Sequence, residues 1–431
     1  MTQHPSSDTT IFLDQPPSCL QFHPSSPNHF LVGTYLLSEH KKEDDDASIQ
    51  QTKTGSLQLW HLDPATNQLT LRHKHPLPYA VFDLHFHPTD PTLAAIATSA
   101  ASVVFFRITI PEGEGKEGVE DASSFITEIH SHQVHEDPSI PALYLAWLPA
   151  GWHSNAESTE GETTPTEYGF AVTFSDGLTT LFNTKLSSPS PPTTAFSIAE
   201  ESSYPATQQI EVWFVAAATY PVSPQEGSKD EKMRYIFTGN DFGSLHTRYL
   251  PPPSNNNPDS DEESNTPILS HDDRARHHTA GVTAILPLPV PMTDGAPWLL
   301  TGSYDESLRV YHASRRGEVL GEIGLGGGVW RLQILSSQQS SSSEGSVEWT
   351  FLVLASCMHA GTRVVKVRVV LGEESGQECE MEVVAEFTEH ESMNYASDVW
   401  KGGHNEGGRR ELVVVSSSFY DRRVCVWRVN L

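Results

Sequence analysis

The segment HTAGVTAI at 278–285, followed by WLLTGSYDESLRVYHASRRGEVLGEIGLGGGVWRLQIL at 298–335, decides the fold. Within it, short apolar or alternating runs occupy 282–286, 298–301, 308–311 and 319–323. The turn SYDES separates the second run from the third, as a tight hairpin requires. The segment therefore predicts four strands joined by turns, which is the sequence form of one blade of a WD-type propeller.

Two histidines each precede an aspartate of their own at the spacing typical of such blades. His278 lies in the loop before the first run, and Asp305 lies in the hairpin after the second. His390 stands ahead of Asp421 in the same way. In these blades the histidine usually bonds the aspartate, and buried polar groups need partners. We therefore predict two buried structural pairs, His278 with Asp305 and His390 with Asp421.

The same pattern recurs seven times along the chain. Segments resembling the third strand of a blade lie at 55–60, 102–107, 177–182, 243–248, 307–311, 362–367 and 423–427. First-strand candidates begin at 19, 81, 142, 212, 282, 329 and 396. Seven units predict an all-β fold, a single seven-bladed WD40-type β-propeller over residues 1–431.

The last unit is one strand short, because the chain stops at Leu431. The apolar residues 11–13 near the N-terminus are expected to supply that strand beside 424–427 and to close the ring. Polar stretches rich in Ser, Glu, Asp, Pro and Gly interrupt the repeats and predict disordered loop inserts near 38–54, 111–124, 153–167, 187–194, 221–232, 251–276 and 336–348.

Composition narrows the classes of partner. With 27 Lys plus Arg against 55 Asp plus Glu, the formal charge is −28, which disfavours nucleic acid and favours basic partners. Much of this charge lies in the inserts, where it also serves solubility. The four cysteines have no CxxC or Cys/His spacing, so we expect reduced thiols, no metal and a cytoplasmic location. No apolar run approaches a membrane span, and we expect a monomer.

Blade six departs from the repeat. The hairpin CMHAG at 357–361 has His359 where other blades have Asp, and the preceding loop has Leu325 where His278 stands in blade five. His359 is therefore either a replacement turn residue or a functional group. No GxSxG, GxxxxGK[ST], HExxH or strand-linked GxGxxG motif points to another chemistry.

Several other side chains are expected near one end of the central channel. Trp330 and Arg331 follow the first inward residue of blade six, and Asp398 lies near the start of the last blade. Tyr304 and Tyr420 lie in hairpins that open at the same end. The aromatic residues either line this end or only pack between blades.

Six motifs, in order HTAGV, TGSYDE, LGGGVWRL, ASCMH, EHESMNYASDVW and SSSFYD, resemble the WD-repeat diphthine methyl esterase family of diphthamide biosynthesis. The resemblance is strong from about residue 237 onward. It implies a hydrolase that removes the methyl ester from methylated diphthine on translation elongation factor 2, giving diphthine and methanol. It implies no cofactor.

The resemblance also implies roles for the residues expected at this end of the channel. His359 and Arg331 suit a proton acceptor and an oxyanion donor, and Asp398 would orient His359 or contact the cation. The substrate's trimethylammonium group suits the aromatic faces of Trp330, Tyr304 and Tyr420. The nucleophile stays open between a water molecule and one of the serines Ser303, Ser392 and Ser418. A noncatalytic scaffold is the alternative function, because most such propellers bind partners.

Overall fold

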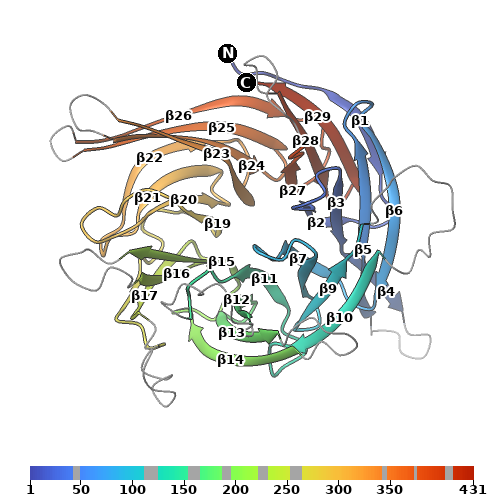
Figure 1. Cartoon of the computed structure of the whole chain (residues 1–431), viewed down its shortest axis with the longest axis horizontal. Helices are drawn as coiled ribbons and strands as arrows, with labels where there is room; N and C mark the ends of the chain where they lie inside the picture. Colours follow the sequence, from blue (N-terminus) through green and yellow to red (C-terminus); the bar gives the residue numbers. More distant parts are fainter. Residues whose placement is uncertain are drawn as a thin grey trace, which may run out of the picture.

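The structure is a computed structural model that describes residues 1–41, 49–110, 125–153, 166–186, 196–221, 232–252, 265–341, 347–372, 376–402 and 411–431. Seven antiparallel sheets are arranged around a central axis (Figure 1), which confirms the predicted seven-bladed, all-β propeller. None of the described residues forms a helix long and apolar enough to cross a membrane.

The strands of the first three blades are named in order from the axis outward, with the extra strand β4 of blade 1 described below. Blade 1 contains β2 (Pro17–Phe22), β3 (His29–Thr34), β5 (Ile49–Asp63) and β6 (Gln68–Leu77). Blade 2 contains β7 (Val81–Phe86), β8 (Leu93–Thr98), β9 (Ser102–Ile108) and β10 (Ile126–Gln133). Blade 3 contains β11 (Ala142–Trp147), β12 (Thr166–Phe174), β13 (Leu178–Leu186) and β14 (Phe196–Pro205).

The next three blades repeat this order. Blade 4 contains β15 (Val212–Pro221), β16 (Lys232–Asn240), β17 (Leu245–Leu250) and β18 (Leu269–Asp272). Blade 5 contains β19 (Val282–Pro287), β20 (Trp298–Ser303), β21 (Ser307–His312) and β22 (Glu318–Gly324). Blade 6 contains β23 (Arg331–Ser341), β24 (Val347–Ser356), β25 (Thr362–Gly372) and β26 (Gly376–Phe387).

Blade 7 joins the two ends of the chain. Its inner strands are β27 (Asn394–Val399), β28 (Glu411–Ser418) and β29 (Arg423–Asn430), and its outer strand is β1 (Ser7–Phe12). β1 pairs antiparallel with β29, with Ile11 opposite Val424. Both termini therefore lie at the same place on the ring (Figure 1), and this pairing covers the outer edge of β29.

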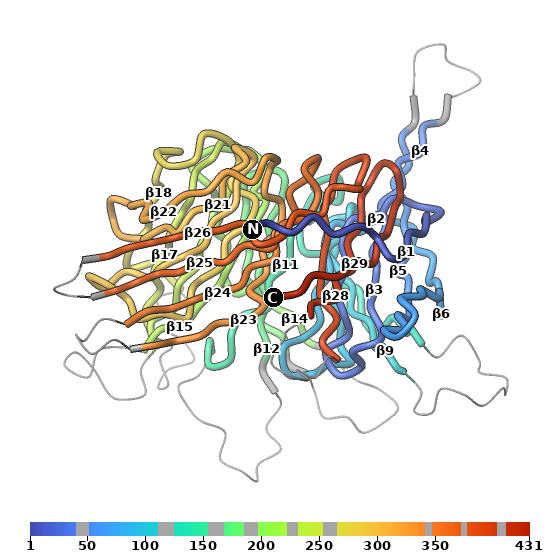
Figure 2. The backbone as a smooth tube through the Cα atoms, turned by 90° about the horizontal axis from the view of Figure 1, so that it is seen from above, coloured from blue at the N-terminus to red at the C-terminus, as the bar shows by residue number. Residues whose placement is uncertain are grey.

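Several predicted inserts contain regular strands at their ends, which corrects the disorder expected there. Residues 36–41 form β4 (Leu36–Lys41), which pairs with the first part of β5 in a hairpin that projects from the ring (Figure 2). β18 lies within 251–276 and is the fourth strand of blade 4, while β23 and β24 extend into 336–348. Polar composition misled here because an outer or projecting strand buries few side chains.

The rest of the predicted inserts cannot be compared with the structure. The stretches 111–124 and 187–194 lie outside the described residues, as do 42–48, 154–165, 222–231, 253–264 and 342–346.

Blades contact one another through small and β-branched residues. A Cβ atom on Gly302 of β20 would lie 2.5 Å from Cγ1 of Val329, the residue just before Trp330 and β23. This close approach requires glycine, and it fixes Val329 as the inward residue at the start of blade 6. Trp330 and Arg331 follow directly, so packing between blades 5 and 6 sets where these two side chains emerge.

Candidate functional site

Aromatic rings form a continuous series at the end of the axis where the innermost strands begin. We define the aromatic rim as Tyr35, Phe82, Trp213, Tyr304, Trp330, Tyr395 and Phe419. Neighbouring ring centroids in this series lie between 5.0 Å and 6.4 Å apart, within the range of favourable aromatic pairs. All seven side chains are half-buried, so each keeps part of its surface open to solvent.

Trp330 is central to the rim. Its ring lies 5.0 Å from Tyr395, 5.5 Å from Trp213 and 5.9 Å from Tyr304. The structure thus brings together two of the predicted cation-binding residues, Trp330 and Tyr304. The third, Tyr420, is 67% exposed and contacts Phe419 at 5.0 Å, so it lies at the outside of the rim.

Arg331 crosses the axis beneath the rim. Its Cζ atom lies 4.7 Å, 4.8 Å and 5.6 Å from the ring centres of Trp330, Tyr144 and Phe214. Its Nη1 donates to the carbonyl oxygens of Thr283 and Trp330, at 3.3 Å and 3.0 Å. Because these contacts come from blades 3 to 6, the guanidinium is held at the centre of the ring.

One carboxylate balances this charge. Nη2 of Arg331 lies 3.7 Å from Oδ1 of Asp83, and the other oxygen of Asp83 accepts a 3.3 Å hydrogen bond from the amide of Leu145. Oδ2 of Asp83 also lies 2.8 Å from Nε2 of His85. Of the three guanidinium nitrogens of Arg331, only Nη1 donates hydrogen bonds to the described residues, so N–H donors remain for a ligand oxygen.

Asp398 lies away from the rim and has a structural role. It is 2% exposed and accepts hydrogen bonds from the amide of Phe22 in blade 1 at 2.8 Å and from Nε2 of Gln333 in blade 6 at 2.9 Å. Burial raises the pKa of Asp398, and the amide of Val399 is a further donor. With both oxygens occupied in this way, Asp398 ties blades 6, 7 and 1 together and does not orient His359.

His359 lies on the exposed turn between β24 and β25. The turn is held by backbone bonds, including Cys357 N to Gly361 O at 2.7 Å and Asn394 N to Met358 O at 3.0 Å. No hydrogen bond to the His359 imidazole is found among the described residues. The structure therefore leaves this ring open to solvent and brings it into no contact with Arg331 or Asp398 in the described part of the chain.

The candidate nucleophiles are hydrogen-bonded or buried, unlike the imidazole of His359. Oγ of Ser303 donates to the carbonyl of Ala280 at 2.9 Å, and Oγ of Ser392 donates to Oδ1 of Asp421 at 2.6 Å. Ser418 is fully buried. Burial raises the pKa of Cys357 to about 12, which keeps it a thiol. The three serines and Cys357 are therefore poorly placed to act as nucleophiles.

The two predicted His–Asp pairs do not form as direct hydrogen bonds. Nε2 of His278 bonds Oγ1 of Thr301 at 2.9 Å, while Oδ2 of Asp305 accepts from the amide of Thr279 at 2.9 Å. In blade 7, His390 bonds Ser416 at 2.8 Å and Asp421 accepts from the amide of Glu391 at 3.1 Å. The aspartate thus holds the residue after the histidine, because its carboxylate reaches the loop backbone.

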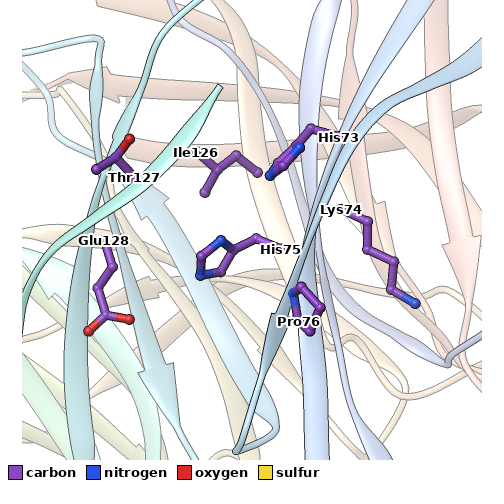
Figure 3. A pocket seen from close by; sticks show the side chains of 7 residues that line it. All are labelled: His73, Lys74, His75, Pro76, Ile126, Thr127 and Glu128. Carbon is purple, nitrogen blue, oxygen red and sulfur yellow. The ribbon is translucent and has the colours of Figure 1, made fainter. Parts of the chain in front are cut away.

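A separate groove of about 390 Å³ lies on the outside of the ring between β6 and β10 (Figure 3). Its lining contains none of the predicted site residues and consists of His73, Lys74, His75, Pro76, Ile126, Thr127 and Glu128. Within the described residues no group of three or more His, Cys, Asp or Glu side chains could hold a metal ion.

Sequence reasoning missed most of the aromatic rim. A signal was present, because an aromatic residue follows the inward valine in three first strands, as Phe82, Trp213 and Trp330. Tyr35 and Phe419 lie in hairpins equivalent to that of Tyr304, and the backbone amide of each bonds the loop before its own blade. Aligning these positions across all blades would have identified them.

Comparison with known proteins gives one partial sequence match. The chain is 30% identical over 150 residues to a protein of Schizosaccharomyces pombe named diphthine methyltransferase. The match spans 35% of this chain and 38% of that protein. The name agrees with the family that the sequence motifs resemble. No family model matches the chain.

Solved structures match over nearly the whole chain, at low identity. Sqt1 of Saccharomyces cerevisiae matches with a TM-score of 0.51 and 12% identity, over 100% of both chains. Sqt1 of Chaetomium thermophilum, bound to the N-terminus of ribosomal protein L10, matches with a TM-score of 0.51 and 14% identity, over 98% of this chain and 100% of that one. At this identity the similarity establishes the WD40 propeller fold alone.

Proposed function

We propose that this protein hydrolyses the methyl ester of methylated diphthine on translation elongation factor 2, giving diphthine and methanol. One observation carries the proposal: Arg331 lies 4.7 Å from Trp330, so a guanidinium and a series of half-exposed aromatic rings lie side by side. The partial match to a protein named diphthine methyltransferase supports a role in diphthamide chemistry.

The aromatic rings and the guanidinium suit two different parts of the substrate, its trimethylammonium group and its ester. A trimethylammonium group binds aromatic faces through cation–π contacts worth about 0.5 to 2 kcal/mol each, and Trp330 and Tyr304 present such faces. The ester carbonyl becomes an oxyanion when water attacks, and the N–H groups of Arg331 are suited to stabilise it. Water adds to the carbonyl carbon, the bond to the methoxy group breaks, and the methoxy oxygen leaves with a proton as methanol.

A proton acceptor completes the reaction. We assign this role to His359, since its imidazole is exposed and its turn is bonded to β27 through Met358 and Asn394. We assign no role to Asp398 in this reaction, because its oxygens already accept hydrogen bonds from Phe22, Gln333 and Val399. We place the reaction in the cytoplasm and propose that the protein acts as a monomer.

A second function is favoured by a specific neighbour. One Sqt1 structure holds the N-terminus of a ribosomal protein, so a propeller of this shape can act by binding a protein partner. Under this alternative the protein would bind the modified factor, or another basic partner, without changing it.

The test is methanol release from elongation factor 2 that carries methylated diphthine, together with the mass of the modified peptide. The proposal predicts one methanol per factor and the loss of one methyl group. Tight binding of the factor with no methanol and no mass change would establish the scaffold instead.

A further inference from the structure

Asp241 and Trp213 form a rigid unit at one side of the aromatic rim. Trp213 lies on β15 and Asp241 follows β16, both in blade 4. Nε1 of Trp213 donates a 2.7 Å hydrogen bond to Oδ1 of Asp241, and the amide of Asp241 donates to the carbonyl of Glu211 at 2.9 Å. The carboxylate therefore fixes the orientation of the indole ring.

The charge of Asp241 also acts on the neighbouring ring, that of Tyr304. Burial, followed by the charges of Asp241 and other neighbours, raises the pKa of the Tyr304 phenol. Trp213 lies 6.4 Å from Tyr304 and 5.5 Å from Trp330. A negative charge is thus placed beside Trp213, whose ring neighbours those of Tyr304 and Trp330 in the proposed cation site.

A charge at this position is needed because Arg331 lies next to Trp330. A cation placed on these rings would meet the positive field of the guanidinium, and Asp83 at 3.7 Å offsets only that one charge. A second carboxylate, Asp241 in blade 4, adds a negative field beside Trp213.

We propose that Asp241 determines the specificity of the rim for a quaternary ammonium group over a neutral group of the same shape. Aromatic rings alone bind both by apolar contact, whereas a carboxylate adjacent to them favours only the charged ligand. Trp213, held by Asp241, completes the aromatic surface. This inference deepens the proposed function, on which the identity of the natural ligand rests.

The test uses choline and its neutral analogue 3,3-dimethylbutan-1-ol, which differ in a nitrogen against a carbon and contain no ester. Binding of each to the full chain is measured by calorimetry and by tryptophan fluorescence. We expect the wild type to prefer choline by roughly tenfold or more, and Asp241→Asn to lower this preference by roughly tenfold.

Two further variants separate charge from positioning. Trp213→Phe keeps the carboxylate but removes the indole N–H, and should weaken both ligands by a similar factor. Arg368→Gln, which removes a charge on β25 that pairs with Glu348 of β24 and Glu380 of β26, should behave as the wild type. An Asp241→Asn protein that keeps the wild-type preference for choline would overturn the proposal, as would a wild type with no preference.

Methanol release from the modified factor distinguishes the two proposals. Choline preference that depends on Asp241, without ester hydrolysis, would refute the proposed reaction and leave the cation site in place. Ester hydrolysis with unchanged preference in Asp241→Asn would do the reverse.

Discussion

The hairpins of blades 5 and 6 occupy equivalent places and are stabilised in different ways. In blade 5, Asp305 accepts bonds from the amides of Thr279 and Ser307 and pairs with Arg309 at 2.9 Å. In blade 6 the hairpin is held by backbone bonds and by Arg363, whose Nη1 donates to the carbonyl of Ala360 at 2.7 Å, while His359 at the position of the aspartate makes no hydrogen bond among the described residues. A side chain released from structural bonding is available for chemistry, and this difference separates blade 6 from its neighbour.

Glycines let the preceding loop approach the hairpin of blade 6 closely. A Cβ atom on Gly327 would lie 2.3 Å from the carbonyl oxygen of Cys357, and one on Gly328 would lie 2.8 Å from Sδ of Met358. The loop before β23 therefore packs directly on the hairpin that carries His359, which no larger residue would allow.

Gly327→Ala is expected to lower both stability and ester hydrolysis. Since the new methyl group would meet backbone, the loop must shift, and we expect a loss of about 1 to 3 kcal/mol in the free energy of unfolding together with reduced ester hydrolysis. Urea unfolding measures the first quantity. Gly324→Ala is the matched control, because a Cβ atom there has nothing within 4 Å; equal stability of the two variants would refute the packing argument.

Asp305→Ala removes the side-chain bonds that stabilise the hairpin of blade 5. It leaves the Thr279 amide without its acceptor and Arg309 with Glu322 as its remaining carboxylate partner, so we expect a loss of roughly 1 to 3 kcal/mol in stability. Thermal unfolding measures it, with Glu318→Ala on exposed β22 as control. Full stability with lost turnover would instead place Asp305 in the active site.

Buried histidines should make stability sensitive to acid. Burial lowers the pKa of His390 from 6.5 to about 4. Between these values the unfolded chain binds more protons than the folded chain, so stability is complete above about pH 6.5 and falls as the pH decreases toward 4. The equivalent position of blade 6 is Leu325, which does not titrate. His390→Gln should flatten the dependence of the unfolding midpoint on pH in this window; an unchanged slope would contradict the assignment.

His359→Ala should have the smallest effect on stability, within about 0.5 kcal/mol, because its side chain is exposed. Under the proposed function it should nevertheless lose most ester hydrolysis while still binding the modified factor. Unfolding and methanol release measured on the same preparation test both statements. Normal turnover would remove His359 from the mechanism and return attention to the serines.

Patterns local in sequence predicted the ring well. The seven recurring third strands, such as 307–311 in β21, depend only on residue alternation and turns, so the blade number followed from them. Pairings between loops were harder: His278 bonds Thr301, a residue of the second strand, and Asp305 reaches the next residue of the loop instead. Short polar side chains choose among partners within a few ångströms, which spacing along the chain does not resolve.

Contacts across the axis were the least predictable. Asp398 was expected near the rim because of its strand, yet it binds Phe22 and Gln333 of the adjacent blades. Arg331 was expected at the correct end, but its neighbours Asp83, Tyr144 and Phe214 come from blades far away in sequence. Only the closed ring brings these residues together.

The most direct test of the proposed function is methanol release from modified elongation factor 2 by the wild type, Arg331→Gln and Arg368→Gln, with thermal unfolding of each. Arg331→Lys keeps the charge and serves if the glutamine variant does not fold. We predict release by the wild type and Arg368→Gln, and a loss of roughly 100-fold or more when Arg331 is replaced, as for other oxyanion donors. Equal rates in folded proteins with and without Arg331 would contradict a reaction centre at this end of the ring.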